Sequence, residues 1–154
     1  MSETRRIRGL LHSVYRGPAW HGPSISENLE GITAAQAASH PIPGAHSIWE
    51  IVHHVTAWER EVVQFLAGKA HVTMQGEDDW PPVKAASEEA WDKTVADLRA
   101  AHTALADAIK RFGDDDLEKI VPGRDFPWFV VFHGIIHHSL YHSGQIAMLK
   151  KAAQ

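Results

Sequence analysis

The chain has 154 residues, of which 44% are hydrophobic and 22% charged, a composition typical of a single globular domain over residues 1–154 and not of a disordered protein. Lys and Arg number 15 against 19 Asp and Glu, and the net charge of −4 argues against a nucleic-acid-binding protein, which needs a basic face. The absence of cysteine excludes disulfides, thiolate metal sites and a cysteine nucleophile, whereas 12 histidines supply the commonest side-chain metal ligand.

No segment of the sequence predicts attachment to a membrane. The first residues are charged and run into no apolar core, so we expect no secretory signal. No window reaches the roughly 20 apolar residues that a membrane-spanning helix needs. We therefore expect a soluble, cytoplasmic protein with neither a membrane nor a nucleic acid as its partner.

Helix start and stop signals dominate the first third of the chain. Residues 4–16 carry apolar side chains at helical spacing, and the Gly-Pro pair at 17–18 ends that helix. Capping-box sequences at 24–27 and 33–36 begin two short helical pieces, because a hydroxyl and a carboxyl or amide there can satisfy the free amides of a helix start. We expect these two pieces to cover one end of a bundle.

Three longer helices are predicted over about 47–67, 87–112 and 126–151. The first begins at a capping box from Ser47 to Glu50 and is closed by Gly68. The last takes Asp125 as its N-cap and Pro127 in its first turn. Together with the N-terminal helix, these elements predict an all-α fold, a four-helix bundle with short extra helical segments between its first two helices.

Four histidines of the last helix form two pairs, His133 with His137 and His138 with His142. Each pair is spaced i, i+4, which stacks two imidazoles on one helix face and suits a single metal ion. A helical wheel places the pair at 138 and 142 on a mostly apolar stripe that faces the core. The other pair lies on the opposite side, at the surface or at an interface.

A third inward histidine is expected from the adjacent His53 and His54. The side chain of His54 falls on the edge of the apolar stripe of its helix, whereas His53 points to the far side. A lone inward histidine is more often a core residue than a ligand, but one cation can satisfy several buried imidazoles at once. We therefore predict a metal site at His54, His138 and His142. The histidines expected to be solvated are His12, His21, His40, His46, His71 and His102.

Weaker candidates surround these histidines. Glu50 lies one turn before His54, where it serves the capping box first and a catalytic proton transfer second. Tyr141 and Gln145 flank the last pair and can hydrogen-bond a metal-bound water or a ring nitrogen. The tryptophans that could line a pocket wall near the histidines are Trp20, Trp58 and Trp128.

Two segments, Ser47-Ile-Trp-Glu-Ile-Val-His-His-Val-Thr-Ala-Trp-Glu59 and His138-Ser-Leu-Tyr-His-Ser-Gly-Gln-Ile146, resemble the signature helices of the DinB-like family, which includes the YfiT-like metal-dependent hydrolases. The resemblance implies a bundle with an up-down-down-up connection and a divalent metal held by three histidines, one from the second helix and two from the last. Carried over, these are His54, His138 and His142. The family often has Arg at the position of Ser143. The resemblance also implies a homodimer. Characterised members of the family include transferases and isomerases that use low-molecular-weight thiols.

Three neutral imidazoles leave open positions on a divalent ion, zinc or nickel, and a water bound there can have a pKa near 7. Our first hypothesis is therefore a metal-dependent enzyme acting on a small molecule. It is either a hydrolase or a thiol-dependent S-transferase in which an external thiolate attacks. The alternative is a non-catalytic helical bundle that binds a metal or a small ligand, because no carboxylate is clearly placed as a general base. A plain bundle with core histidines is the third possibility.

Overall fold

The regular structure of residues 2–69 and 73–153, the parts of the chain that the computed structural model describes, is entirely helical. The elements are α1 (Glu3–Arg16), α2 (Ile25–Leu29), α3 (Ala34–Ala38), α4 (Ile48–Leu66), α5 (Glu88–Arg111), the 3-10 turn η1 (Asp114–Asp116) and α6 (Trp128–Ala152). No strand occurs in these two ranges, so the expected all-α class is confirmed.

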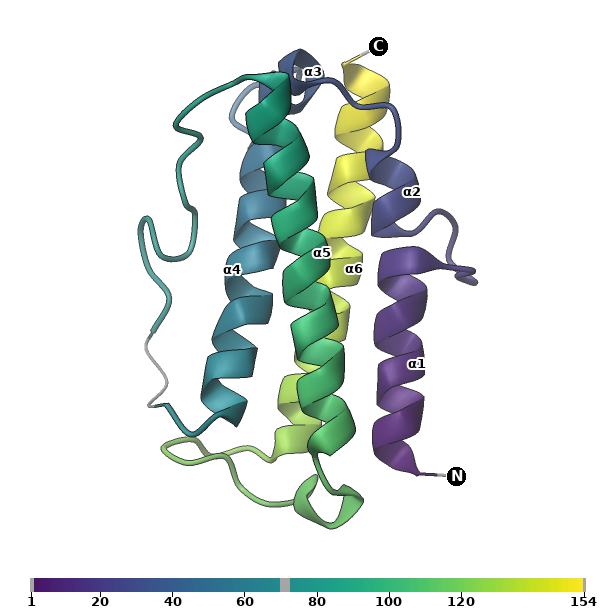
Figure 1. Ribbon diagram of the computed structural model, residues 1–154, viewed down its shortest axis with the longest axis vertical. Helices are drawn as coiled ribbons and strands as arrows, with labels where there is room; N and C mark the ends of the chain where they lie inside the picture. The colour runs from purple at the N-terminus through teal and green to yellow at the C-terminus, as the bar shows by residue number, and fades with distance from the viewer. Residues whose placement is uncertain (1, 70–72, 154) are drawn as a thin grey trace.

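The four long helices form a bundle with the up-down-down-up connection that the family resemblance implies. Figure 1 shows α1 and α6 running toward one end and α4 and α5 running toward the other. Helix α4 packs against both α5 and α6, and α1 closes the bundle on their other side. The two short helices cover one end as expected, with α3 against α4 and α5 and with α2 against α1 and α6.

Helix starts are fixed by the capping side chains that the sequence predicts. Ser24, Thr33 and Ser47 each accept a hydrogen bond from the third backbone amide of their helix, and all three capping boxes are complete. The end of α4 is set by Gly68, whose φ of 83° is a conformation that other residues rarely adopt. These caps fix where α4 begins and ends.

The expected start of the last helix is wrong. Asp125 is not an N-cap, because α6 begins at Trp128 after Pro127, whose side chain makes no capping hydrogen bond. The first amides of α6 are satisfied by backbone carbonyls instead: Trp128 donates to the carbonyl of Lys119 at 3.2 Å and Phe129 to that of Leu117 at 2.9 Å. Proline also disfavours the helical conformation of the residue that precedes it. This keeps the helix from starting two residues earlier.

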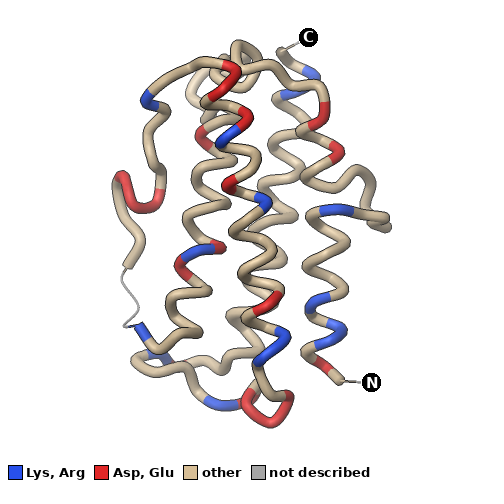
Figure 2. The backbone as a smooth tube through the Cα atoms, viewed as in Figure 1, with Lys and Arg blue, Asp and Glu red and all other residues tan. Residues whose placement is uncertain are grey.

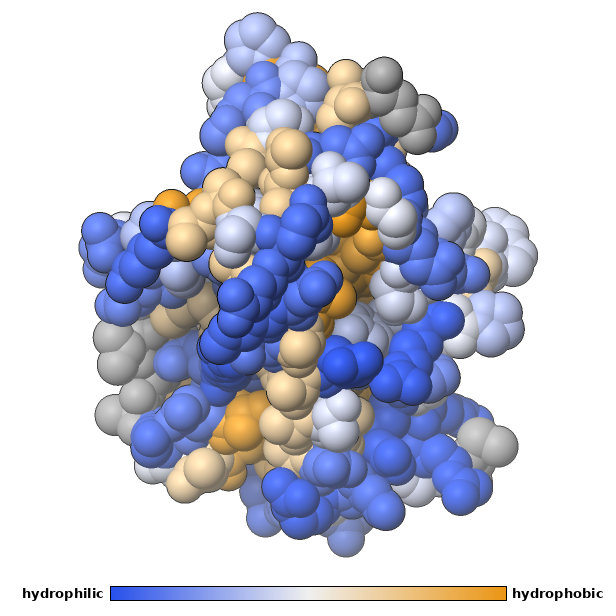
Figure 3. Space-filling view, turned by 45° about the horizontal axis from the view of Figure 1, so that its top comes forward, coloured by the Kyte–Doolittle hydropathy of each residue, from blue (hydrophilic) through white to orange (hydrophobic). Residues whose placement is uncertain are grey.

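Charged residues are nearly absent from α6. In Figure 2, α6 carries no charged residue before Lys150 in its last turn. Most of the face in Figure 3 is hydrophilic, and hydrophobic side chains show there only in narrow seams between polar ones. Although α6 is apolar over most of its length, no described helix is long and apolar enough to cross a membrane.

Candidate metal centre

Three histidines from two helices converge inside the bundle. His54 lies on the buried side of α4, and His138 and His142 lie one turn apart on α6. One ring nitrogen from each lies within 4.8 Å of the others. The structure thus brings together the three side chains that the helical wheels predict to face the core.

The spacing of these nitrogens suits a single ion. The Nε2 atoms of His54 and His138 are 2.8 Å apart. The ring centroid of His142 lies 4.7 Å from that of His54 and 4.5 Å from that of His138. Two nitrogens bound to one zinc ion at ~2.0–2.1 Å each are separated by roughly 3 Å, so little movement is needed for one cation to contact the group.

The ring of His54 is oriented by the loop that joins α4 to α5. Its Nδ1 donates a hydrogen bond to the backbone carbonyl of Asp79 at 2.7 Å, and a carboxylate oxygen of the same residue lies 3.2 Å away. That carboxylate also accepts a hydrogen bond from Nε1 of Trp58 at 2.7 Å. Since a carbonyl can only accept, Nδ1 carries the proton and the lone pair of Nε2 faces the other histidines.

The two histidines of α6 are oriented in different ways. His142 donates from Nδ1 to the side-chain oxygen of Gln145 at 2.6 Å, which again leaves Nε2 free to bind a metal. The Nδ1 atom of His138 is buried and has no hydrogen-bond partner within the described chain. Its ring lies beside that of Trp58, with centroids 5.7 Å apart, so packing holds it in place.

Burial keeps these imidazoles neutral. It lowers the pKa of His138 to about 3, with the neighbouring His142 and His54 adding to the effect. It lowers the pKa of His142 to about 4 and also lowers that of His54, although hydrogen bonds to Gln145 and Asp79 oppose the shift. All three are therefore unprotonated at neutral pH, which is the form that ligates metals. The donor set fits a divalent ion.

Two residues of the same loop complete the site, and the sequence analysis does not identify either. They are Asp79 and Trp80. The indole of Trp80 is stacked between the rings of His54, 3.9 Å away, and His46, 3.6 Å away. A loop has no periodicity that tells which way its side chains face, so the only signal was a large apolar residue in a polar segment.

The weaker catalytic candidates differ in how close they come to the cluster. Gln145 contacts His142 directly, as described above. Tyr141 is 65% exposed, but its ring lies beside that of His142 with centroids 5.1 Å apart. The carboxylate of Glu50 accepts a hydrogen bond from the Ser47 amide at 2.7 Å and lies 3.1 Å from Nε2 of His40, so it is engaged at the helix start.

Of the three tryptophans expected along a pocket wall, one is there. Trp58 lines a pocket together with His138. Trp20 is fully exposed, and its expected place is wrong, because it lies in the loop after α1. Trp128 belongs to the core instead, where it packs against a set of phenylalanines. These are Phe65, Phe112 and Phe132.

The remaining histidines are accounted for as follows. His53 turns away from the cluster, because its Nδ1 donates to the carbonyl of Pro81 at 3.0 Å and its Nε2 accepts from the Trp49 indole.

His102 is buried with 5% exposure, so the expectation that it is solvated is wrong. His133 is half-buried and His137 exposed, in line with a surface position. His71 lies outside the described residues. The exposed ones are His12, His21, His40 and His46.

The position at which relatives often carry Arg is buried here. Ser143 is 2% exposed, and its hydroxyl accepts a hydrogen bond from the amide nitrogen of Asn28 at 3.1 Å. This contact joins α2 to α6. Ser143 therefore serves the packing of a short helix against the bundle.

Comparison with known protein families places most of the chain in one of them. A model of the DinB superfamily matches residues 23–146, a range that runs from the start of α2 into α6 and contains all three converging histidines. Comparisons with curated proteins and with solved structures gave no match.

Proposed function

We propose that this chain, which belongs to the DinB superfamily, binds a divalent metal ion through His54, His138 and His142 and uses it in chemistry on a small molecule. The observation that carries the proposal is the convergence of three neutral imidazole nitrogens within 4.8 Å, from helices far apart in sequence. When bound, a divalent ion with three neutral ligands supplies a Lewis acid with open positions.

The surrounding residues hold the site ready for the ion. Asp79 and Gln145 fix the tautomers of His54 and His142, so that two Nε2 lone pairs point inward without rearrangement. The indoles of Trp58 and Trp80 lie against the ligand rings and reduce contact with water. Charge interactions are stronger in such a surrounding than in bulk solvent.

We propose zinc or nickel as the resident ion. Imidazole nitrogens suit both metals, and three of them do not select one. Competition between the two ions at defined free concentrations, with metal content measured after dialysis, distinguishes them.

Transfer to or from an external thiol is the reaction that we favour over hydrolysis. A water bound to the ion still carries a second proton that a base usually accepts during hydrolysis, and the nearby carboxylates are engaged elsewhere. Asp79 binds Nδ1 of His54, on the side of the ring away from the converging nitrogens, and Glu50 caps α4. A thiol that binds a divalent ion does so as a thiolate with no further proton to lose, so its attack needs no such base.

Turnover that follows metal content tests the proposal. Metal-free, zinc-loaded and nickel-loaded protein are assayed with model esters, with amides, and with chlorodinitrobenzene plus a small thiol. We expect thiol conjugation to rise in proportion to bound metal and to be absent in His138→Ala, with His53→Ala as the matched control. Equal turnover by metal-free protein contradicts metal chemistry. Tight metal binding without any turnover supports the non-catalytic binding module instead.

We also propose that the chain forms a homodimer. Val130, Tyr141 and Met148 are exposed, and their spacing along α6 places them on one face of the helix. An apolar face of this kind is suited to a second copy. Sedimentation of the wild type against Tyr141→Glu tests this, since a dimer through α6 dissociates in the variant.

A further inference from the structure

A long apolar cavity begins at the proposed metal site and runs away from it between α4 and α6. Its volume is about 460 Å³, and His138 is both one of its lining residues and a member of the histidine cluster. The cavity is therefore continuous with the place where a metal-bound group reacts.

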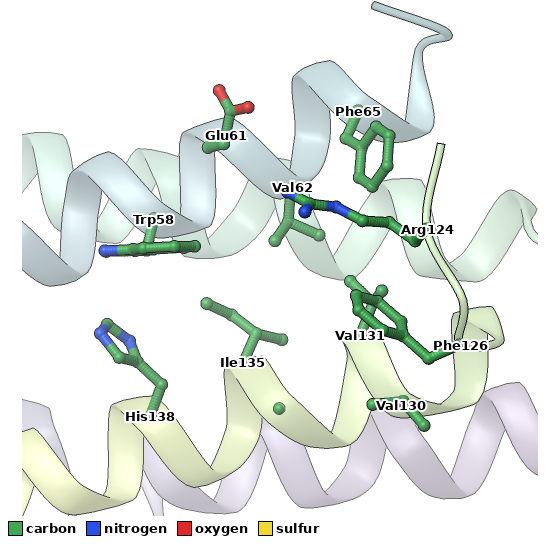
Figure 4. Close-up of a pocket in the computed structure, with 11 residues that line it drawn as sticks. Trp58, Glu61, Val62, Phe65, Arg124, Phe126, Val130, Val131, Ile135 and His138 are labelled. Atoms are coloured by element: carbon green, nitrogen blue, oxygen red, sulfur yellow. The ribbon is translucent and has the colours of Figure 1, made fainter. Parts of the chain in front are cut away.

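Both walls of the cavity repeat at helical spacing. They are Trp58, Val62 and Phe65 on α4 and Val131, Ile135 and His138 on α6. The helices are antiparallel, so Trp58 faces His138 at one end, as Figure 4 shows. Seven residues of α-helix rise by roughly 10 Å, which sets the length of this apolar stretch.

The end of the cavity away from the histidines carries positive charge. Arg124 lines it, and Figure 4 shows its side chain reaching from the loop before α6 toward Val62. A second cavity of about 440 Å³ shares Phe65 and Arg124 with the first and adds Lys69. Within the described ranges no carboxylate lies within ion-pair distance of the guanidinium of Arg124, and no acidic residue lines the second cavity.

One acidic residue does line the first cavity. This is Glu61, and in Figure 4 its carboxylate points away from Ile135 and His138, on the outer side of α4. The lining between the histidines and the guanidinium of Arg124 is thus apolar, and the Arg124 side chain enters the cavity from the end away from the histidines. Burying an alkyl or aromatic group there is favourable, whereas burying a charge halfway along it is not.

We infer that the pocket takes an elongated small molecule with a reactive group at the histidines, an apolar middle between α4 and α6, and a carboxylate or similar anion at Arg124 and Lys69. This inference rests on the proposed metal site and names the substrate class for it. The seven-residue walls correspond to at most about seven or eight methylenes, since a chain of ~1.5 Å carbon–carbon bonds advances by somewhat less than that per atom, and the Arg124 side chain reaches into that length.

Three thiols of equal length test the inference, because the thiol end binds a metal and only the other end differs. They are 8-mercaptooctanoate, 8-mercaptooctan-1-ol and 8-aminooctane-1-thiol, titrated into cobalt-loaded protein and followed by calorimetry and by the cobalt absorption spectrum. We expect the carboxylate to bind about tenfold more tightly than the alcohol and the amine to bind most weakly. Among mercaptoalkanoates, affinity should rise about fourfold for each methylene up to the length of the cavity.

Variants test whether the preference for a carboxylate arises at Arg124 and Lys69. Arg124→Ala should remove most of the advantage of the carboxylate, and adding Lys69→Ala should remove the rest, with affinity for the alcohol unchanged in both. Arg124→Glu should favour the amine. Arg99→Ala, which removes an exposed arginine of α5, is the matched control. Val131→Trp fills the cavity and should weaken all three thiols without changing the cobalt content.

The two proposals fail in different ways. Protein that binds cobalt but takes the three thiols with equal affinity, or an Arg124→Ala variant that keeps the preference for the carboxylate, overturns the inference and leaves the metal site intact. Protein that takes up no cobalt overturns the proposed function and the inference with it.

Discussion

Two clusters of buried histidine lie along α4, and they differ in what partners the imidazoles. On the side of α6, His54 meets His138 and His142, and three rings converge with no carboxylate between them. On the side of α5, His102 meets a buried carboxylate, that of Glu59. His54, His142 and His102 are all buried, so burial alone does not distinguish a cluster that could hold a metal ion from a structural one.

The cluster on α5 contains its own counter-group. Nδ1 of His102 lies 3.4 Å from a carboxylate oxygen of Glu59, which is 1% exposed, and the ring of Tyr15 stacks on the imidazole at 4.2 Å. Burial raises the pKa of the Glu59 carboxyl, and the nearby imidazole of His102 opposes the shift. A proton shared between Nδ1 of His102 and the nearer carboxylate oxygen satisfies those two atoms, whereas Oε2 of Glu59 is buried without a hydrogen-bond partner within the described chain.

The two clusters differ in what the Nδ1 nitrogen of each imidazole contacts. In the α6 cluster, Nδ1 of His54 and of His142 bonds to a carbonyl or amide oxygen, so that the Nε2 atoms point at one another. Two Nε2 lone pairs, those of His54 and His142, therefore face the ring of His138, whose Nε2 lies 2.8 Å from that of His54, and acceptors that converge in this way suit a cation. The comparison therefore teaches that convergence of acceptors distinguishes the cluster that could hold a metal ion.

The largest effect is expected from removing a ligand. His138→Ala should weaken zinc binding by well over 100-fold, because even residues that only orient a ligand contribute about 10–100-fold. His53→Ala, one residue from His54 but bonded to Pro81, should bind zinc as the wild type does. Calorimetric titration measures both. Equal losses in the two variants contradict the assignment of ligands.

Substitutions in the cluster of Glu59 and His102 should lower the stability of the fold. Glu59→Ala removes one member of a buried pair and should lower the free energy of unfolding by about 3 kcal/mol, measured by urea denaturation of metal-free protein. Replacing both members, Glu59→Leu with His102→Leu, should recover part of that loss. Zinc affinity of the folded variant should stay unchanged. A loss of zinc binding in Glu59→Ala would show that the two clusters are one site.

Acid should destabilise the metal-free protein through the converging histidines. Their pKa values are lowered to about 4 at His142 and about 3 at His138, so between about pH 6.5 and pH 4 the unfolded chain binds protons that the folded chain does not. Stability therefore falls as pH falls, by up to ~1.4 kcal/mol per pH unit for each histidine. Glu59, whose pKa is raised, acts in the opposite direction.

A variant separates the two contributions to the pH dependence. His138→Ala keeps Glu59 and should show a shallower loss of stability over the same pH range. Urea denaturation at half-unit steps of pH measures the slopes. Identical slopes in wild type and variant would contradict a neutral, buried His138.

The smallest effect is expected from the oxygen that orients His142. Gln145→Leu keeps the volume but removes the acceptor of Nδ1, and zinc affinity should fall by about tenfold. Gln64→Leu, a glutamine exposed on α4, is the control for the loss of a polar side chain. Unchanged zinc affinity in Gln145→Leu would show that packing alone orients the ring, as it does for His138.

The helices and the phase of each could be predicted because their signals are local. The three capping boxes and Gly68 fix the start and end of short stretches, and the i, i+4 spacing of His138 and His142 fixes their common face. Two helices with correct phases are enough to select which histidines can meet. What the pattern leaves open is whether they bind a metal.

The failures occur where contacts are distant in sequence. Asp79 and Trp80 reach the site from a loop, which has no periodicity, and the start of α6 depends on carbonyls of Leu117 and Lys119. His102 was expected to be solvated and is buried, although it lies four residues after Leu98 on the buried side of α5, a spacing that indicates burial.

X-ray absorption of zinc-loaded protein tests the central claim most directly, since it reports the ligands of the metal. We predict one zinc ion per chain with three imidazole nitrogens, and loss of one imidazole or of the metal in His54→Ala. Zinc bound by carboxylate oxygens with fewer than two imidazoles, or no zinc retained after dialysis, would contradict the account.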